Sequence, residues 1–160
     1  FAATALADDP AVPAFVLDLA RHELSVYASG SAPDAPPGAR RGAEDLALDR
    51  GAAFDPSVRL GRYAFAVHEL SEDPDARDTP RALDTRLLAY RDADDTVRFI
   101  ALSPLAADVV QRLLDGATLR AAIEGACAIG GVALDDDVLA GTGAVLEDLG
   151  ARGALLGAAP

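Results

Sequence analysis

The chain is poor in the residue types that metal and redox sites use most. Its 160 residues include one cysteine, Cys127, and two histidines, His22 and His68. A single cysteine excludes an intramolecular disulfide framework and favours a reducing compartment, so we expect a cytoplasmic protein. These three side chains are too few for a zinc or iron site unless carboxylates complete it. We therefore expect no metal ligands and no cofactor in this chain.

Long apolar runs and methionine are missing as well. Apolar residues make up 51% of the chain, but no run approaches the length of a membrane-spanning helix. The segment that opens at Phe1 lacks the basic flank that precedes a secretory signal. We expect no membrane partner. The absence of methionine, even at position 1, predicts that the N-terminus is truncated.

Cationic side chains are far fewer than acidic ones. The chain has 14 Arg, no Lys and 26 Asp or Glu, which gives a formal net charge of −12. This charge repels the phosphates of nucleic acids and anionic lipids over most of the surface. The composition therefore argues against a nucleic acid partner.

The apolar content is nevertheless sufficient for a buried core, and the N-terminal part predicts a helix. Apolar residues recur at helical spacing from Val12 to Ala28, on a stripe that includes Tyr27. Glu23 falls on the same stripe. It is either a partly buried carboxylate with an Arg partner or the wet edge of the stripe, and the second interpretation is favoured.

A segment rich in proline and glycine, residues 31–38, follows this helix and predicts a linker. We place the domain boundary shortly after it. Residues 1–50 are then an N-terminal helical segment with its linker, and residues 51–160 form a larger module.

The module opens with signals for β-structure. Tyr63, Phe65 and Val67 alternate on one face, which predicts a strand, with a helix as the competitor because of the alanine content. Residues 86–91 and 97–102 flank a polar turn, and this pattern is typical of a β-hairpin.

Three short helices are expected after the hairpin. The first begins at Ser103, whose hydroxyl caps the helix ahead of a proline at the first helical position. Thr118 caps the second helix, and the acidic run from Asp135 begins the third. A last short strand is expected at residues 154–156. The fold class is α+β and mostly helical: an N-terminal helical segment followed by a winged helix-turn-helix-like module of a β-hairpin plus three helices.

The common catalytic patterns are not found. The glycines of residues 125–130 are not followed by the Lys-Ser or Lys-Thr of a phosphate loop, and residues 141–143 lie inside a helical pattern. The turn at Asp92 matches the start of a calcium loop but lacks its glycine and its last glutamate. Cys127 lies on an apolar helix face, where a thiol is usually inert. We expect no catalytic residue and no enzyme activity.

Several segments resemble, in their order along the chain, a known group of proteins. The segments 18–23, 55–60, 63–67 and 102–119, with the hairpin between the last two, resemble the partner proteins of multinuclear non-haem iron oxidative enzymes. This group includes the MbnC and TglI types and a related family described as a DNA-binding domain. From Arg86 onward the chain also resembles the PqqD-like recognition element of ribosomal peptide biosynthesis.

The resemblance implies a non-catalytic partner subunit. Such a subunit binds the leader of a ribosomally made, cysteine-containing precursor peptide and presents it to the iron enzyme, with which it forms a heteromeric complex. The iron then belongs to the partner enzyme. The docking residues expected on the segments that carry the resemblance are Arg21, Glu23, Arg59 and Tyr63.

Binding of this kind needs no catalytic residue, because an extended peptide can add a strand to the open edge of the hairpin. The pattern and the resemblance together place the peptide-binding side chains on the hairpin and on the third helix. These residues are Val97, Phe99, Ala101, Val138 and Leu146. The alternative is that the same side chains simply fill the core.

A DNA-binding transcriptional regulator with a winged helix-turn-helix is the alternative function, with residues 118–129 as its recognition helix. That helix offers only Arg120 against Glu124, and residues 86–160 hold 6 Arg against 11 acidic residues. A free-standing enzyme would need a catalytic constellation that the sequence does not contain.

Overall fold

The structure, a computed structural model, describes residues 12–39, 46–71, 73 and 75–159. Within these residues the chain is α+β, with four α-helices and two small antiparallel sheets. The elements are α2 (Phe15–Gly30), β1 (Ala52–Phe54), β2 (Arg59–Phe65), the 3₁₀-helix η2 (Val67–Glu69), β3 (Ala82–Arg91), β4 (Val97–Ala101), α3 (Pro104–Leu114), α4 (Leu119–Gly130), α5 (Asp136–Ala151) and β5 (Leu155–Ala158). The predicted α+β class is confirmed, whereas the winged helix-turn-helix arrangement stays a prediction.

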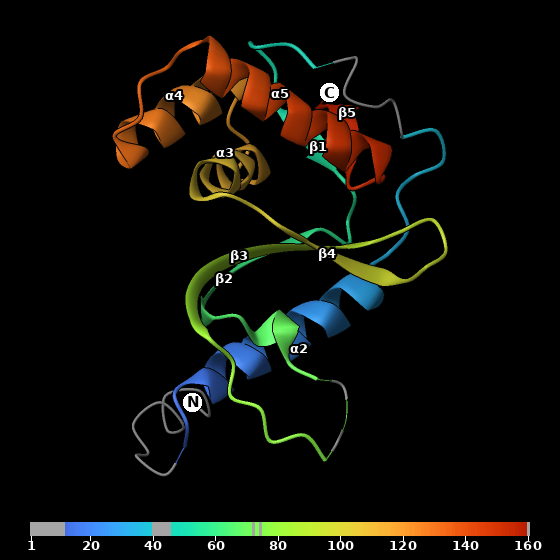
Figure 1. Ribbon diagram of the computed structural model, residues 1–160. Coiled ribbons are helices and arrows are strands. Elements are labelled where there is room, and N and C mark those ends of the chain that lie inside the picture. The colour runs from blue at the N-terminus through green and yellow to red at the C-terminus, as the bar shows by residue number, and fades with distance from the viewer. Residues whose placement is uncertain (1–11, 40–45, 72, 74, 160) are drawn as a thin grey trace.

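The larger sheet has the order β2-β3-β4, and its neighbouring strands are antiparallel. β3 and β4 form the predicted hairpin, in which Leu87 lies opposite Ala101 and Leu88 lies opposite Ile100. Successive residues of a strand point to opposite faces, so Leu87 and Ala101 share one face while Leu88 and Ile100 share the other. Helices cover both faces, and the sheet therefore lies between two hydrophobic cores (Figure 1).

The larger core lies between one face of the sheet and the helices α3, α4 and α5 (Figure 1). These helices begin where the sequence predicts. The side chains of Ser103, Thr118 and Asp135 each accept a hydrogen bond from a backbone N–H in the first turn. The fully buried side chains include Leu88 of β3 and Leu113 of α3. Burial of a leucine contributes about 1.5–3 kcal/mol, so this layer is a main source of stability.

The helix α2 covers the opposite face of the sheet (Figure 1). Its buried carboxylate, Asp18, accepts hydrogen bonds from Ala64 N at 2.6 Å and from Phe65 N at 3.2 Å. The pairing of β2 with β3 shifts register between Tyr63 and Phe65, which frees backbone amides from the ladder. Asp18 therefore ties α2 to the sheet.

The predicted domain boundary near residue 50 stays a prediction.

The strand predicted from Tyr63 to Val67 begins and ends earlier than expected. β2 pairs with β3 from Arg59 to Phe65, and Val67 opens η2. One more hydrogen bond, from Ala66 N to Arg81 O at 2.9 Å, follows Phe65 before the chain enters η2. Val67 then buries its side chain in the smaller core beneath α2.

β1 and β5 form a second, two-stranded sheet. The strand expected at residues 154–156 is confirmed as β5, whereas its partner β1 was not predicted. Beyond β1, Asp55 N donates to Ala154 O at 2.9 Å. The chain then turns into β2 because Asp55 Oδ1 accepts hydrogen bonds from Ser57 N at 2.9 Å and from Ser57 Oγ at 2.6 Å. This buried turn joins the two sheets.

Candidate functional site

The outer edge of β4 presents backbone groups that the sheet does not use. At one end of the β3–β4 ladder Leu102 N donates to Arg86 O at 2.9 Å, and at the other end Asp92 N donates to Thr96 O at 2.9 Å. Hydrogen-bonded pairs alternate with non-bonded pairs in an antiparallel ladder. In the described part of the chain no strand lies on the other side of β4. The residues whose N–H and C=O groups point away from β3 are therefore Val97, Phe99 and Ala101.

Two cavities of about 320 Å³ and 290 Å³ lie beside the end of β4, between it, the start of α3 and one side of α5. They share the lining residues Ser103, Ala106 and Val145, so they are neighbours, and together they are here called the β4–α5 groove. Its lining residues are Ile100, Ala101, Leu102, Ser103, Leu105, Ala106, Asp137, Val138, Gly141, Thr142, Ala144, Val145, Asp148 and Leu149.

Small and apolar side chains line most of the groove. On α5, Gly141 and Ala144 lie one turn apart and keep the wall low. A Cβ atom at Gly141 would meet no other atom within 4 Å, so this glycine opens space and does not serve a close helix contact. Gly141 and Gly143 lie inside α5, in agreement with the helical pattern that the sequence shows at residues 141–143.

The structure separates the side chains that the sequence assigns to peptide binding. Val97, Phe99 and Ala101 point to the face of α2, where the ring of Phe99 lies 4.7 Å from that of His22. Val138 lines the β4–α5 groove on the other side of the sheet, and Leu146 is buried in the larger core. Only the backbone edge of β4 and the side chain of Val138 meet at one groove.

The four expected docking residues are also divided. Tyr63 is buried beneath α2, and Arg59 donates hydrogen bonds to backbone carbonyls of its own turn. Arg21 and Glu23 are exposed on α2, and the exposure of Glu23 agrees with the wet-edge interpretation. Tyr27, which the sequence places on the apolar stripe, is 75% exposed.

The outer face of α2 also carries an apolar residue that the sequence interpretation missed. Leu24 is 67% exposed, three residues before the exposed Tyr27, so the two side chains are neighbours on the helix. The stripe that contacts the sheet runs instead through Asp18 and His22. Helical periodicity could have found this face only if polar residues had been allowed on the buried stripe.

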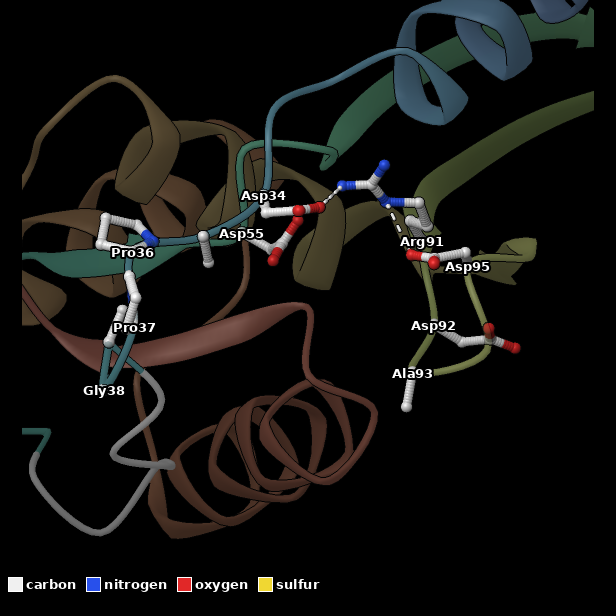
Figure 2. A pocket seen from close by; sticks show the side chains of 11 residues that line it. Asp34, Pro36, Pro37, Gly38, Asp55, Arg91, Asp92, Ala93 and Asp95 are labelled. Carbon is white, nitrogen blue, oxygen red and sulfur yellow. Dashed lines mark hydrogen bonds and ion pairs between the residues drawn. The ribbon is translucent and has the colours of Figure 1, made fainter.

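Figure 2 shows a separate pocket of about 350 Å³ between the proline-rich residues 34–39 and the turn of the hairpin. The guanidinium of Arg91 lies 2.7 Å from Asp34 Oδ1 and 3.7 Å from Asp95 Oδ1. It also donates a hydrogen bond to Gly30 O at 3.4 Å. Arg91 thus braces the predicted linker against the hairpin, and two carboxylates of this pocket already have a cationic partner.

The Asp92 carboxylate organises the hairpin turn itself. Asp92 Oδ1 accepts hydrogen bonds from Asp94 N and Thr96 N, and Asp92 Oδ2 accepts one from Arg98 Nε at 2.8 Å. The hydrogen bond from Arg98, followed by that from Thr96, lowers the pKa of Asp92 below its usual value. The partial match to a calcium loop therefore reflects a turn in which this carboxylate is bound by the chain itself.

Among the residues that the structure describes, no group of three or more His, Cys, Asp or Glu side chains is placed so that it could hold a metal ion. No described helix combines the length and the apolar character that crossing a membrane requires.

Comparison with known protein families gives a match to more than half of the chain. Residues 56–150 match the family model of the HvfC C-terminal domain. These residues include β2, the hairpin, α3, α4 and almost all of α5, so they contain the whole β4–α5 groove. No curated protein matches the sequence. Because the match covers more than half of its residues, the chain belongs to the family of the HvfC C-terminal domain.

Proposed function

We propose that this chain is a non-catalytic partner subunit that binds a ribosomally made precursor peptide and presents it to an iron-dependent oxidative enzyme. The observation that carries the proposal is the open edge of β4 beside the β4–α5 groove. Membership of the HvfC C-terminal domain family supports the partner role in a biosynthetic system. The closer resemblance to MbnC, TglI and PqqD-like proteins stays a prediction.

The peptide binds by strand addition. Its backbone pairs with the outward N–H and C=O groups of β4, at Phe99 and Ala101, and alternate side chains enter the groove toward α5. The groove side chains that receive them are Ile100, Leu102 and Val145. The side chains of Val97, Phe99 and Ala101 lie on the other face of the sheet, so their contribution comes mainly from the backbone.

The chemistry takes place on the partner enzyme in this proposal. Iron, held by the enzyme, oxidises the peptide, which we expect to contain cysteine. The enzyme docks on the exposed face of α2, where Arg21 and Glu23 lie beside the apolar Leu24 and Tyr27. An apolar centre with charged residues around it is the usual composition of a protein interface.

A co-purification experiment tests the proposal. The tagged chain is expressed with the iron enzyme and the short peptide that its neighbouring genes encode, and the mixture is separated by size exclusion. We expect a stoichiometric complex that retains the peptide. The Ala101→Pro variant should keep the enzyme but lose about fivefold or more of its affinity for the peptide, because one outward N–H is removed at about 1 kcal/mol per hydrogen bond.

The Ala101→Val variant is the matched control, since it keeps the backbone N–H at the same position. Retention of the peptide by Ala101→Pro at wild-type affinity would exclude strand addition at this edge. Separate elution of chain, enzyme and peptide would exclude the partner role. Both variants are checked by circular dichroism, so that a folding defect is not taken for a binding defect.

A DNA-binding regulator has less support. In a helix-turn-helix the N-terminal residues of the recognition helix contact the bases. Here the first amides of α4 are covered by the loop before β1: Leu119 N donates to Arg50 O and Arg120 N donates to Leu48 O, both at 2.8 Å. The acidic charge of the chain adds to this obstacle.

A further inference from the structure

The charges of the β4–α5 groove are of one sign. Asp137 and Asp148 are the charged residues that line it. Asp148 is already neutralised, because Arg152 Nε lies 2.8 Å from its Oδ2. Asp137 is exposed in the first turn of α5 and, within the described part of the chain, has no ion-pair partner. The groove therefore carries one uncompensated carboxylate.

This carboxylate lies at a defined end of the groove. The cavity next to β4 is lined by Ala101 and by the second half of α5, whereas the second cavity is lined by Asp137 and by the start of α3. We expect a strand that pairs with β4 and continues past Ala101 to cover first the cavity next to β4 and then the cavity that Asp137 lines. Side chains on one face of that strand recur about every 7 Å.

We propose, on the basis of the peptide-binding function above, that the bound segment is basic and apolar in a fixed order. Two small or apolar side chains at alternate positions of the peptide fill the two cavities. An Arg or Lys of the peptide lies beyond this pair, past the Ala101 end of β4, and forms an ion pair with Asp137. Antiparallel addition is the more stable arrangement and runs opposite to β4, so the basic residue precedes the apolar pair. The net charge of −12 also repels an acidic segment.

Fluorescein-labelled synthetic peptides test this inference by anisotropy on the full chain. The peptides share one polar host sequence with an apolar pair at alternate positions, and they carry Arg before the pair, Arg after the pair, or Glu before the pair. We expect the peptide with Arg before the pair to bind tightest. The Asp137→Asn variant should weaken its binding about twofold to fivefold, as expected for an exposed ion pair, and added salt should reduce this difference.

The Asp136→Asn variant is the matched control. Asp136 lies in the same first turn of α5 and makes the same contribution to the helix dipole, but it does not line the groove. We expect it to bind all peptides as the wild type does.

The outcomes separate this inference from the function on which it rests. If the Glu peptide binds as tightly as the Arg peptides, or if Asp137→Asn and Asp136→Asn behave alike, the basic segment is excluded while peptide binding stands. If Arg after the pair binds tighter, the antiparallel order is overturned. If no peptide with an apolar pair binds, the proposed function falls, and this inference with it.

Discussion

The side chain of Ser57 makes two of the hydrogen bonds that hold the two sheets together. It is fully buried, its Oγ donates to Asp55, and it accepts a hydrogen bond from Arg91 N at 3.0 Å. We expect Ser57→Ala to lower the free energy of unfolding by about 1–3 kcal/mol, because buried polar partners lose their hydrogen bond. Urea unfolding measures this. The exposed Ser31→Ala change is the control, and equal effects of the two would contradict the role given to Ser57.

His22 is the residue at which stability should depend on pH. Burial lowers its pKa below 6.5; Glu23 partly offsets this, and His68 adds to it. Its Nδ1 has no hydrogen-bond partner and its ring packs on Tyr63 and Phe99. The unfolded chain therefore binds the proton more tightly than the folded chain.

Stability should consequently be complete above pH 6.5 and should fall as the pH decreases from 6.5 toward the lower folded-state pKa. The His22→Phe variant keeps the aromatic contacts and should flatten this dependence in urea unfolding measured across the window. The His68→Gln variant, changed at an exposed position, should retain most of it. An unchanged slope in His22→Phe would assign the dependence to another group.

At the scale of the elements, α5 contains two glycines that its packing does not require. A Cβ at Gly141 or at Gly143 would meet no atom within 4 Å, and neither has a positive φ. We expect each change to Ala to raise the free energy of unfolding by about 0.5–1 kcal/mol, because glycine weakens a helix interior. Thermal unfolding measures the gain. A loss of stability would show that the helix needs these glycines.

Substitutions at Gly141 and Gly143 also distinguish an effect on stability from an effect on peptide binding. Gly141 lines the β4–α5 groove and Gly143 does not. A larger side chain in Gly141→Leu should therefore obstruct the peptide while Gly143→Leu leaves the groove open. Equal affinity of the two variants for the peptide with Arg before the apolar pair would contradict the location of the site.

The sequence predicted correctly those helices whose first residues are set by short-range contacts. The caps at Ser103, Thr118 and Asp135 were predicted from residue type and position alone, and each forms the expected hydrogen bond. β1 was missed because its three residues have no pattern of their own and pair with β5, about a hundred residues later in the chain. Such pairing leaves no trace in a local window.

At the scale of the whole molecule, the site could be predicted only in part. The sequence predicted that the edge of the hairpin is open, but it did not predict which face of β4 lies toward α5. Both faces of β4 carry apolar side chains: Phe99 and Ala101 lie on one face, and Ile100 and Leu102 lie on the other. Only the packing of α2 on one face and of α5 on the other distinguishes them. Whether the groove binds a peptide stays a prediction.

The pairing of β1 with β5 also has a consequence for the order in which the molecule is made. During synthesis β1 leaves the ribosome well before β5 is made. β1 therefore has no strand to pair with until the last strand of the described chain has been synthesised. Contacts so distant along the chain form late in folding, because closing the long loop costs entropy before the pairing compensates for it. We therefore expect the hairpin and α3 of the nascent protein to form while β1 still lacks its partner.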